Sequence, residues 1–239
     1  VNVPEELTES IGLSRLNESL FERMIRICQQ NGWDHAWDIL TEHYRMHDEI
    51  AGLINHYYDN RLKSGSINQQ ASECFNIKSD HQPDLFRKRT LFIPCKASAR
   101  MKINPDEARL IVSLIAQYEA EGILDQFSLG VICFWKAQCN LIQHLLKEKE
   151  INREIMVDTV ERYQGSEKDI IIVSTALSKK SDLEIVSLQT HDQKVDRKLN
   201  VAVSRARQQF ILTGDPKILN YSPHYRHLLS LLSLYLMDQ

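Results

Sequence analysis

Three short blocks of the sequence contain residue types suited to phosphate chemistry. Glu42–His47 contains a Tyr-Arg pair, Val157–Ile172 has a polar turn with one glycine between two apolar runs, and Leu199–Arg207 ends in Ser-Arg-Ala-Arg. A planar guanidinium keeps its charge and donates several hydrogen bonds, so it suits phosphoryl transfer. The arginines of these blocks are therefore compatible with contact to a phosphate, although the residue types alone are more typical of surface ion pairs.

Other kinds of catalytic site are not indicated. His43 and His47 are four residues apart and Glu49 is nearby, but the H-E-x-x-H pattern of helical zinc sites is not met. Arg45 lies between the two histidines, where its charge would oppose a bound dication. We therefore expect no metal site. The chain also has no Gly-x-Ser-x-Gly elbow and no evident pair of catalytic carboxylates.

The chain has no phosphate-binding loop of its own. That loop has the pattern Gly-x-x-x-x-Gly-Lys-Ser/Thr, and none of the eight glycines is followed by lysine. The chain therefore does not contain a complete nucleotide site of the phosphate-loop type.

Composition places the chain among ordinary globular proteins. Of its 239 residues, 43% are hydrophobic and 26% are charged, which excludes wholesale disorder. The net charge of −3 neither requires nor excludes a nucleic-acid partner. The five cysteines form no CxxC pair, and no run approaches the roughly 18 apolar residues of a membrane span. We therefore expect an intracellular protein, in cytoplasm or nucleus, without a membrane partner.

Short apolar runs rich in β-branched residues alternate with helical segments along most of the chain. The predicted strands are Thr90–Pro94, Leu129–Phe134, Ile155–Val160, Ile170–Ser174 and Phe210–Thr213. The predicted helices include His47–Tyr58, one that begins with a capping box at Asn104–Glu107, Ala137–Lys149, and the Leu-rich segment His224–Met237. This alternation is typical of a parallel sheet covered on both faces, so we expect a three-layer α/β domain.

Taken together, the three blocks resemble motifs in the second motor domain of superfamily-1 helicases. The nearest group is that of the nonsense-mediated-decay helicase, senataxin and the Dna-two-type enzymes, which carry Q-Y-R-M-H, V-D-x-F-Q-G-x-E-K-D-I-I and L-N-V-A-L-T-R-A-R in this order. Two further segments, Ser19–Arg23 and Gly130–Gln138, are similar to motifs of the same group. The departures are mild: His43 replaces glutamine, Tyr163 replaces phenylalanine, and Ser204 replaces threonine with its hydroxyl kept.

The resemblance implies a RecA-like domain with a mostly parallel sheet flanked by helices. It also implies three parts: an N-terminal helical connecting segment (residues 1–35), a RecA-like helicase C-terminal domain (residues 36–221) and a C-terminal helix (residues 222–239). In this family an upstream RecA-like domain of the same polypeptide supplies the phosphate loop and the magnesium-binding acidic pair, and we expect such a domain before Val1.

The resemblance implies roles for five residues in an ATP site. Arg45 and Arg205 would reach the γ-phosphate as arginine fingers. Tyr44 would stack on the adenine, and Glu167, after a turn where Gly165 permits close backbone approach, would accept a hydrogen bond from the ribose. The expected cofactor is ATP with Mg²⁺, which the other motor domain mainly holds. A core tyrosine and a solvated carboxylate remain simpler explanations of Tyr44 and Glu167.

The resemblance also implies contacts with single-stranded RNA or DNA at the other edge of the sheet. Thr159 would donate its hydroxyl to a phosphate, whereas Trp135, Lys136 and Gln138 follow a strand end, where ligands bind in open α/β sheets. Trp135 would stack on a base, unless it only fills a helix–strand junction. The basic residues within Arg87–Lys102 are typical of a solvated face, but they could also guide a strand.

The expected function is therefore that of the second motor domain of an ATP-dependent helicase, which moves on single-stranded nucleic acid, 5′ to 3′ by resemblance. Without a phosphate loop the chain is expected to be inactive alone. Two alternatives remain open. One is a hydrolysis-deficient scaffold that binds nucleic acid or docks proteins, and the other is a stand-alone regulator that mimics this domain and binds another helicase.

Overall fold

The computed structural model describes residues 20–70, 74–75, 83–98, 100, 102–190 and 193–236. The chain divides into two compact units, Val1–Thr41 and Glu42–Gln239. The first unit contains helix α2 (Leu20–Gln30) and the 3-10 helix η1 (Asp34–Ala36). Residues 1–19 of the predicted connecting segment lie outside the described residues, and the boundaries predicted after residues 35 and 221 stay predictions.

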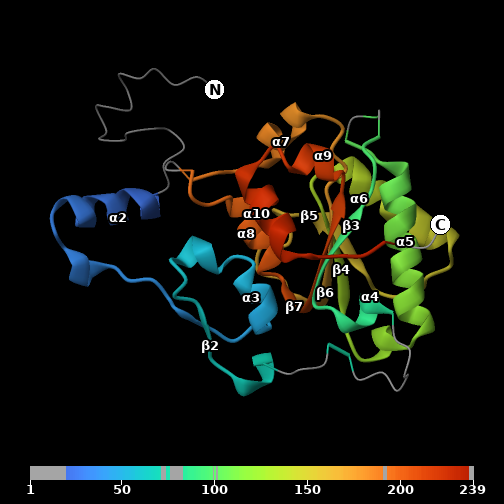
Figure 1. Ribbon diagram of the computed structural model, residues 1–239, viewed down its shortest axis with the longest axis horizontal. Helices are drawn as coiled ribbons and strands as arrows, with labels where there is room; N and C mark the ends of the chain where they lie inside the picture. The colour runs from blue at the N-terminus through green and yellow to red at the C-terminus, as the bar shows by residue number, and fades with distance from the viewer. Residues whose placement is uncertain are drawn as a thin grey trace. The chain divides into compact units, whose positions relative to one another are not determined.

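The second unit has a six-stranded sheet and, among its described residues, helices on both faces (Figure 1). Its sheet strands are β3 (Thr90–Pro94), β4 (Leu129–Cys133), β5 (Met156–Thr159), β6 (Lys168–Ser174), β7 (Ala206–Gly214) and β8 (Ser233–Leu234). Its α-helices are α3 (Asp48–Gly52), α4 (Asp84–Arg87), α5 (Pro105–Ala120), α6 (Lys136–Glu148), α7 (Lys180–Val186), α8 (Arg197–Val203), α9 (Pro216–Leu219) and α10 (Pro223–Leu231). Its 3-10 helices are η2 (Asn55–Tyr58), η3 (Ile67–Gln70) and η4 (Ile123–Asp125).

The sheet has the strand order β5-β4-β6-β7-β3-β8, and every pairing in it is parallel. All five predicted strands are confirmed, and β3 matches its predicted bounds at both ends. A parallel sheet buries both faces, which explains why these strands are almost continuously apolar. The RecA-like α/β class predicted from the sequence therefore describes the second unit.

Successive side chains of each strand enter different cores. In β6, Ile170 and Ile172 belong to one buried cluster, whereas Ile171 and Val173 belong to the other. Helices α5 and α6 cover the first cluster, and α3, α7, α8 and α10 cover the second, so the unit has three layers (Figure 1).

The two cores fix the orientation of the sheet, and parallel pairing then gives it two distinct ends. We call the end where β4, β6 and β7 begin the amino edge, and the end where β4 to β7 finish the carboxyl edge. The residues at each edge come from distant parts of the chain, so the fold determines which of them meet.

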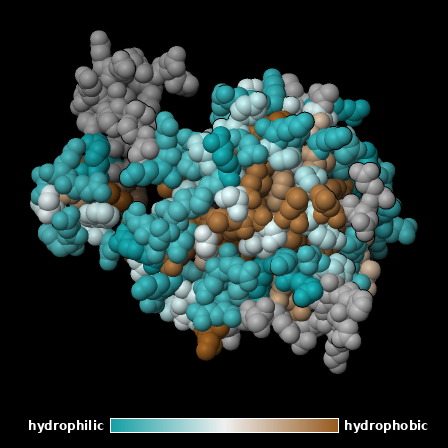
Figure 2. All heavy atoms as spheres, viewed as in Figure 1, coloured by the Kyte–Doolittle hydropathy of each residue, from teal (hydrophilic) through white to brown (hydrophobic). Residues whose placement is uncertain are grey.

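The helix predicted over His224–Met237 ends earlier than expected. Helix α10 stops at Leu231, Leu232 takes an extended conformation, and β8 then pairs with β3 in the register Leu91 to Ser233. The β3 backbone would otherwise present an open edge, and this long-range pairing overrides the helical spacing of the leucines. Figure 2 shows apolar side chains gathered where β3, β8 and α10 lie in Figure 1, and Leu234 is 62% exposed.

The helix predicted over His47–Tyr58 is also interrupted. Helix α3 ends at Gly52, and a separate 3-10 turn, η2, follows it. The Asn55 side chain accepts a hydrogen bond from the Leu62 N–H (2.9 Å) and donates one to the Leu62 carbonyl (3.2 Å). These bonds close a turn through Asp59, whose φ is +53°, so the chain reverses instead of continuing the helix. It then forms β2 (Lys63–Ser64), which pairs with β1 (Glu42–His43).

Helix α5 begins where its predicted cap places it. The Asn104 side chain accepts a hydrogen bond from the Glu107 N–H, and Pro105 occupies the first helical position. The return bond of the predicted capping box does not form, because the Asn104 N–H donates instead to the Gln138 side chain (2.9 Å). This exchange ties the start of α5 to α6. Among the described residues, no helix is both long enough and apolar enough to cross a membrane.

Candidate functional site

The three blocks of the sequence meet at the amino edge. The Arg45 Nε donates to Glu167 Oε2 at 2.5 Å, and the Arg45 Nη1 donates to the Ser204 carbonyl at 3.3 Å. Arg45 follows β1, Glu167 precedes β6, and Ser204 ends α8. Residues separated by 122 and 159 positions in the chain therefore form one contact group at the edge of the sheet.

Arg205 is held in the same group by three hydrogen bonds. Its guanidinium donates to the Val201 carbonyl (3.2 Å), the Ser166 carbonyl (3.2 Å) and the Ser204 hydroxyl (3.4 Å). Burial, and then the charge of Arg45, lower the pKa of Arg205 below its ordinary value. Two guanidiniums thus share a partly desolvated corner, where an additional anion would be stabilised.

Arg207 and Asp169 extend this group, and the sequence reasoning assigned neither of them a role. Arg207 lies 3.6 Å from Glu167 Oε1 and 3.7 Å from Asp169 Oδ1. Asp169 is anchored in turn, because its Oδ2 accepts hydrogen bonds from the Ser128 N–H (2.8 Å) and hydroxyl (2.7 Å). Arg207 is the second arginine of the Ser-Arg-Ala-Arg sequence, and this position beside Arg205 could have indicated that it belongs to the site. Glu167 therefore has an arginine on each carboxylate oxygen.

Tyr44 lies at the surface, directly before Arg45 in the chain. Its side chain is 69% exposed, and its hydroxyl donates to Glu42 Oε2 at 3.3 Å. The ring lies against the backbone of Gly65, where an added Cβ would be 2.3 to 2.8 Å from three ring atoms. Gly65, which the sequence reasoning did not select, therefore permits this position of the ring. Gly165 has a φ of +86° with open space around its Cα, so its conformation is what requires glycine.

Trp135 and Lys136 lie at the carboxyl edge, directly after β4. Trp135 is 9% exposed, and the Lys102 ammonium lies 5.4 Å from its ring centroid. Its indole N–H has no hydrogen-bond partner among the described residues. The exposed Lys136 pairs with Asp158 at 3.0 Å. Burial raises the pKa of Asp158, but hydrogen bonds from the Thr159 N–H and Lys136 outweigh it, so the pKa is below its ordinary value. Half-buried Thr159 ends the neighbouring strand β5.

Gln138 is buried beneath this edge and is fully engaged by protein groups. Its amide donates to the Ser174 hydroxyl (3.1 Å) and the Asn104 carbonyl (3.2 Å), and its carbonyl accepts from the Asn104 N–H. In this conformation it joins α5 and α6 to β6. Its predicted contact with nucleic acid stays a prediction.

Glu107 is the centre of the same buried network, although the sequence analysis gave it only a capping role. One carboxylate oxygen accepts hydrogen bonds from the Ser174 hydroxyl (2.9 Å), the Thr213 hydroxyl (2.9 Å) and the Ala176 N–H (3.2 Å). Burial raises the pKa of Glu107 to about 7, against the effect of these donors. No spacing in the sequence indicates this role, because the partners lie 67 to 106 positions away.

The basic stretch within Arg87–Lys102 does not form one continuous face. Arg89 precedes β3 and is buried, donating to the Gln208 side chain at 2.9 Å and pairing with Glu49 at 3.7 Å. Lys102 follows the same strand and covers Trp135. The strand thus separates the basic residues into two groups at opposite ends of the sheet. Within the described residues, no cluster of three or more His, Cys, Asp or Glu could hold a metal ion.

Comparison with known proteins gives consistent matches over most of the chain. Residues 16–217 match the AAA domain family. Regulator of nonsense transcripts 1 of Dictyostelium discoideum is 28% identical over 235 residues, which cover 95% of this chain and 17% of that protein. The DNA replication ATP-dependent helicase/nuclease dna2 of Schizosaccharomyces pombe is 36% identical over 129 residues, which cover 54% of this chain and 9% of that protein.

Two further proteins are similar to this chain. ATP-dependent helicase upf1 of Schizosaccharomyces pombe is 25% identical over 225 residues, which cover 90% of this chain and 23% of that protein. The solved C-terminal domain of a possible DNA helicase from Lactobacillus plantarum has a TM-score of 0.49 and 16% identity, over 80% of this chain and 98% of its own. The chain therefore spans less than a quarter of the length of each of these three curated relatives.

Proposed function

This chain belongs to the AAA domain family, as a superfamily-1 helicase motor domain of the nonsense-mediated-decay and Dna2 group, and on that basis we propose that it is the second motor domain of an ATP-dependent helicase. It completes an ATP site whose phosphate loop lies on an upstream RecA-like domain of the same polypeptide. It also holds single-stranded RNA or DNA at the opposite edge of its sheet.

The convergence of Arg45, Glu167 and Arg205 at the amino edge is the observation that carries this proposal. At this corner the positive charges of two guanidiniums lie close together, and a nearby anion lowers their repulsion. The triphosphate of Mg²⁺-bound ATP is such an anion. Arg45 and Arg205 then act as fingers that neutralise the charge spread over the γ-phosphate oxygens in the transition state.

Glu167 and Tyr44 hold the nucleoside part of ATP. Glu167 is 41% exposed and accepts a hydrogen bond from a ribose hydroxyl, while the exposed ring of Tyr44 stacks on the adenine. The Arg45–Glu167 ion pair opens when ATP enters, which frees Arg45 for the phosphates. Arg207 stays beside Glu167 and preserves its charge.

The carboxyl edge provides the grip on nucleic acid. Lys136 is 57% exposed and Thr159 ends the adjacent strand, so both can reach a backbone phosphate. Trp135 offers its ring for stacking after Lys102 moves from it towards a phosphate. These contacts read the backbone and base faces, so they suit a motor that tracks one strand of any sequence.

One rigid sheet joins the two edges. Strand β6 begins beside Glu167 and ends at Ser174, a span of about 20 Å at roughly 3.3 Å per residue. When ATP draws the amino edge towards the upstream domain, the carboxyl edge moves with it as part of the same body. Cycles of binding and hydrolysis thereby move the grip along the strand.

The test is the ATPase activity of the longer polypeptide that contains this domain and a phosphate-loop domain. We expect single-stranded nucleic acid to stimulate hydrolysis and Arg205→Ala to reduce kcat by roughly 10³- to 10⁵-fold, the range for arginine fingers. Arg226→Ala is the matched control, because Arg226 is exposed on α10 and its guanidinium donates to the Asn220 carbonyl rather than to any residue of the amino edge that the structure describes. The 239-residue chain alone should not hydrolyse ATP.

Three results would contradict the proposal. Hydrolysis by Arg205→Ala at the rate of Arg226→Ala would exclude the finger role. Hydrolysis by the isolated chain would exclude the need for a second domain. Tight binding of nucleic acid without any ATPase in the intact polypeptide would instead identify the scaffold alternative.

A further inference from the structure

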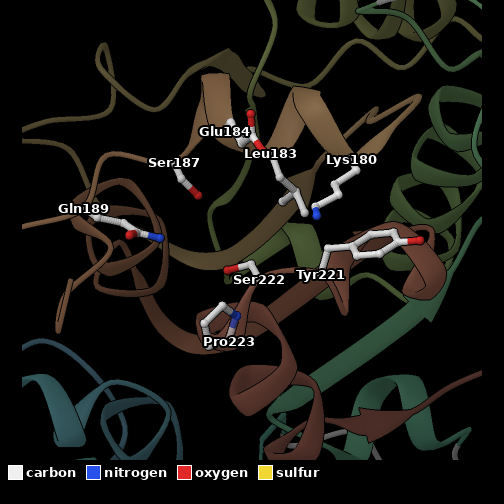
Figure 3. A pocket seen from close by; sticks show the side chains of 8 residues that line it. All are labelled: Lys180, Leu183, Glu184, Ser187, Gln189, Tyr221, Ser222 and Pro223. Carbon is white, nitrogen blue, oxygen red and sulfur yellow. The ribbon is translucent and has the colours of Figure 1, made fainter.

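A small hollow between α7 and the α9–α10 connection lies outside every motif used above. Its volume is about 130 Å³, and Figure 3 shows side chains from both segments around it. Its walls combine apolar groups with groups that can donate and accept hydrogen bonds: Leu183, Tyr221 and Pro223, together with Ser187, Gln189 and Ser222. We call it the α7–α10 hollow.

Among the residues that the structure describes, none forms a hydrogen bond with the Ser222 hydroxyl. Ser222 is the N-cap residue of α10, a position where serine usually accepts a hydrogen bond from the first turn, yet its side chain makes no such bond. The residue is only 6% exposed, and its Oγ is buried without a hydrogen-bond partner within the described part of the chain. In Figure 3 the hydroxyl points into the hollow, towards the side where Gln189 lies. A buried hydroxyl in this state favours a ligand that supplies the missing bond.

Tyr221 provides an aromatic wall at the surface. It is 58% exposed, and the Lys180 ammonium lies 5.1 Å from its ring centroid. The pair repeats the arrangement of Lys102 over Trp135. A lysine over a ring is easily displaced by a flat ligand, after which the ammonium is free to meet a phosphate.

The hollow lies at the carboxyl edge, on the same side as the proposed nucleic-acid grip. Lys180 follows the end of β6, and Tyr221 follows the end of β7. Two contacts connect this region with that of Trp135: the Ser178 hydroxyl donates to the Arg100 carbonyl at 2.7 Å, and the rings of Phe134 and Tyr225 lie 6.3 Å apart. The two lysine–aromatic pairs therefore lie on segments that follow strands at the same edge of the sheet and that contact one another.

The charges around the hollow select the part of a nucleic acid that enters it. Glu184 lines the hollow and disfavours a phosphate inside, whereas Lys180 attracts one outside. A nucleobase is flat, neutral and apolar on its faces, and its edge carries donors and acceptors that Ser222 and Gln189 can satisfy.

We propose that the α7–α10 hollow is a base-binding site, in which one unpaired nucleobase of the bound single strand stacks on Tyr221 and hydrogen-bonds to Ser222. The site extends the nucleic-acid grip of the proposed function, on which it rests, beyond Thr159, Trp135 and Lys136. At this position the identity of the base would affect the affinity of the domain for the single strand.

The experiment compares two labelled single strands of equal length by fluorescence anisotropy, with the full-length protein. One strand carries bases of mixed sequence, and the other consists of abasic nucleotides. Tyr221→Ala should weaken binding of the base-bearing strand about tenfold and leave the abasic strand unchanged, because a stack on one base is lost. Tyr221→Phe keeps the ring and should bind both strands like the unaltered protein.

Two further variants separate the contributions of base and phosphate. Lys180→Ala should weaken both strands to the same extent, since it removes a backbone contact. Ser222→Ala should change the ratio of affinities among homopolymers of A, C and U several-fold, with the abasic strand unaffected. Ile67→Ala is the control, because Ile67 is 83% exposed and lies in η3, outside the hollow.

The outcomes distinguish the two proposals. If the unaltered protein binds neither strand, the proposed function fails and the base site fails with it. If the protein binds but Tyr221→Ala affects neither strand, or affects both equally, the base site is refuted and the proposed function stands. Loss of discrimination among homopolymers in Ser222→Ala supports the base site directly.

Discussion

Replacing Glu107 by glutamine tests how burial shapes the stability of this domain. Glu107 is fully buried, and burial raises its pKa from the ordinary value of 4.5 to about 7. The folded protein therefore binds a proton more tightly than the unfolded chain does. Between pH 4.5 and pH 7 the folded state keeps this proton while the unfolded state loses it, so the free energy of unfolding falls as the pH rises.

The size of this effect follows from the two pKa values. At about 1.4 kcal/mol per pKa unit, the change from 4.5 to about 7 corresponds to a loss of about 3 kcal/mol across this pH range. In Glu107→Gln the side chain has no proton to lose, so this contribution becomes independent of pH. The variant also places an amide NH₂ near the Ala176 N–H, where the carboxylate oxygen accepted a hydrogen bond. The loss of this bond lowers the unfolding free energy of the variant by an amount that does not depend on pH.

The assay is urea denaturation of the unaltered chain and of Glu107→Gln at intervals from pH 4.5 to pH 8. The difference in unfolding free energy should change by about 3 kcal/mol in favour of the variant as the pH rises through this range. Glu148→Gln, which alters a largely exposed carboxylate on α6, should give a curve parallel to the unaltered chain. A parallel curve for Glu107→Gln as well would refute the argument that burial holds this proton.

Three further substitutions test contacts at the amino edge and in the sheet. Gly65→Ala places a Cβ 2.3 Å from the Tyr44 ring and displaces it, so steady-state kinetics of the longer polypeptide should show a several-fold higher KM for ATP, with thermal unfolding unchanged. Arg207→Ala removes the weaker of two cations on Glu167, so it should also raise KM while kcat, unlike in Arg205→Ala, stays within severalfold. Gly130→Ala places a Cβ 2.3 Å from the Tyr163 hydroxyl and should lower the unfolding free energy by about 1–3 kcal/mol in urea denaturation, an effect that is reduced when Tyr163→Phe is added.

The regular parts of the fold were predictable because their signals are local. Runs such as Thr90–Pro94 and Ile170–Ser174 combine β-branched residues with full burial, and Asn104 followed by Pro105 marks a helix start within a few residues. The predicted helix boundaries were wrong where contacts with distant segments of the chain determine the local structure. The pairing of β8 with β3 shortened the last helix, and the bonds of Asn55 to Leu62 divided another.

The candidate site was predictable only in part, for the same reason. The sequence motifs selected Arg45, Glu167 and Arg205, and the structure brings these residues together. The burial of Gln138 was not foreseen, since a glutamine in the first turn of a helix normally faces solvent. Nor does any local pattern link Glu107 to Thr213, because their contact depends on how α5 packs over the sheet.

The placement of the two proposed sites at opposite ends of parallel strands has a consequence for how such proteins diversify. The connections after β6 and β7 carry Lys180 and Tyr221, whereas the residues around Arg45 and Arg205 lie beyond a buried apolar layer. Insertions or replacements in those connections can therefore change which nucleic acid is bound without altering the proposed ATP site. Related domains can in this way keep the same ATP site and differ in the nucleic acid that they bind.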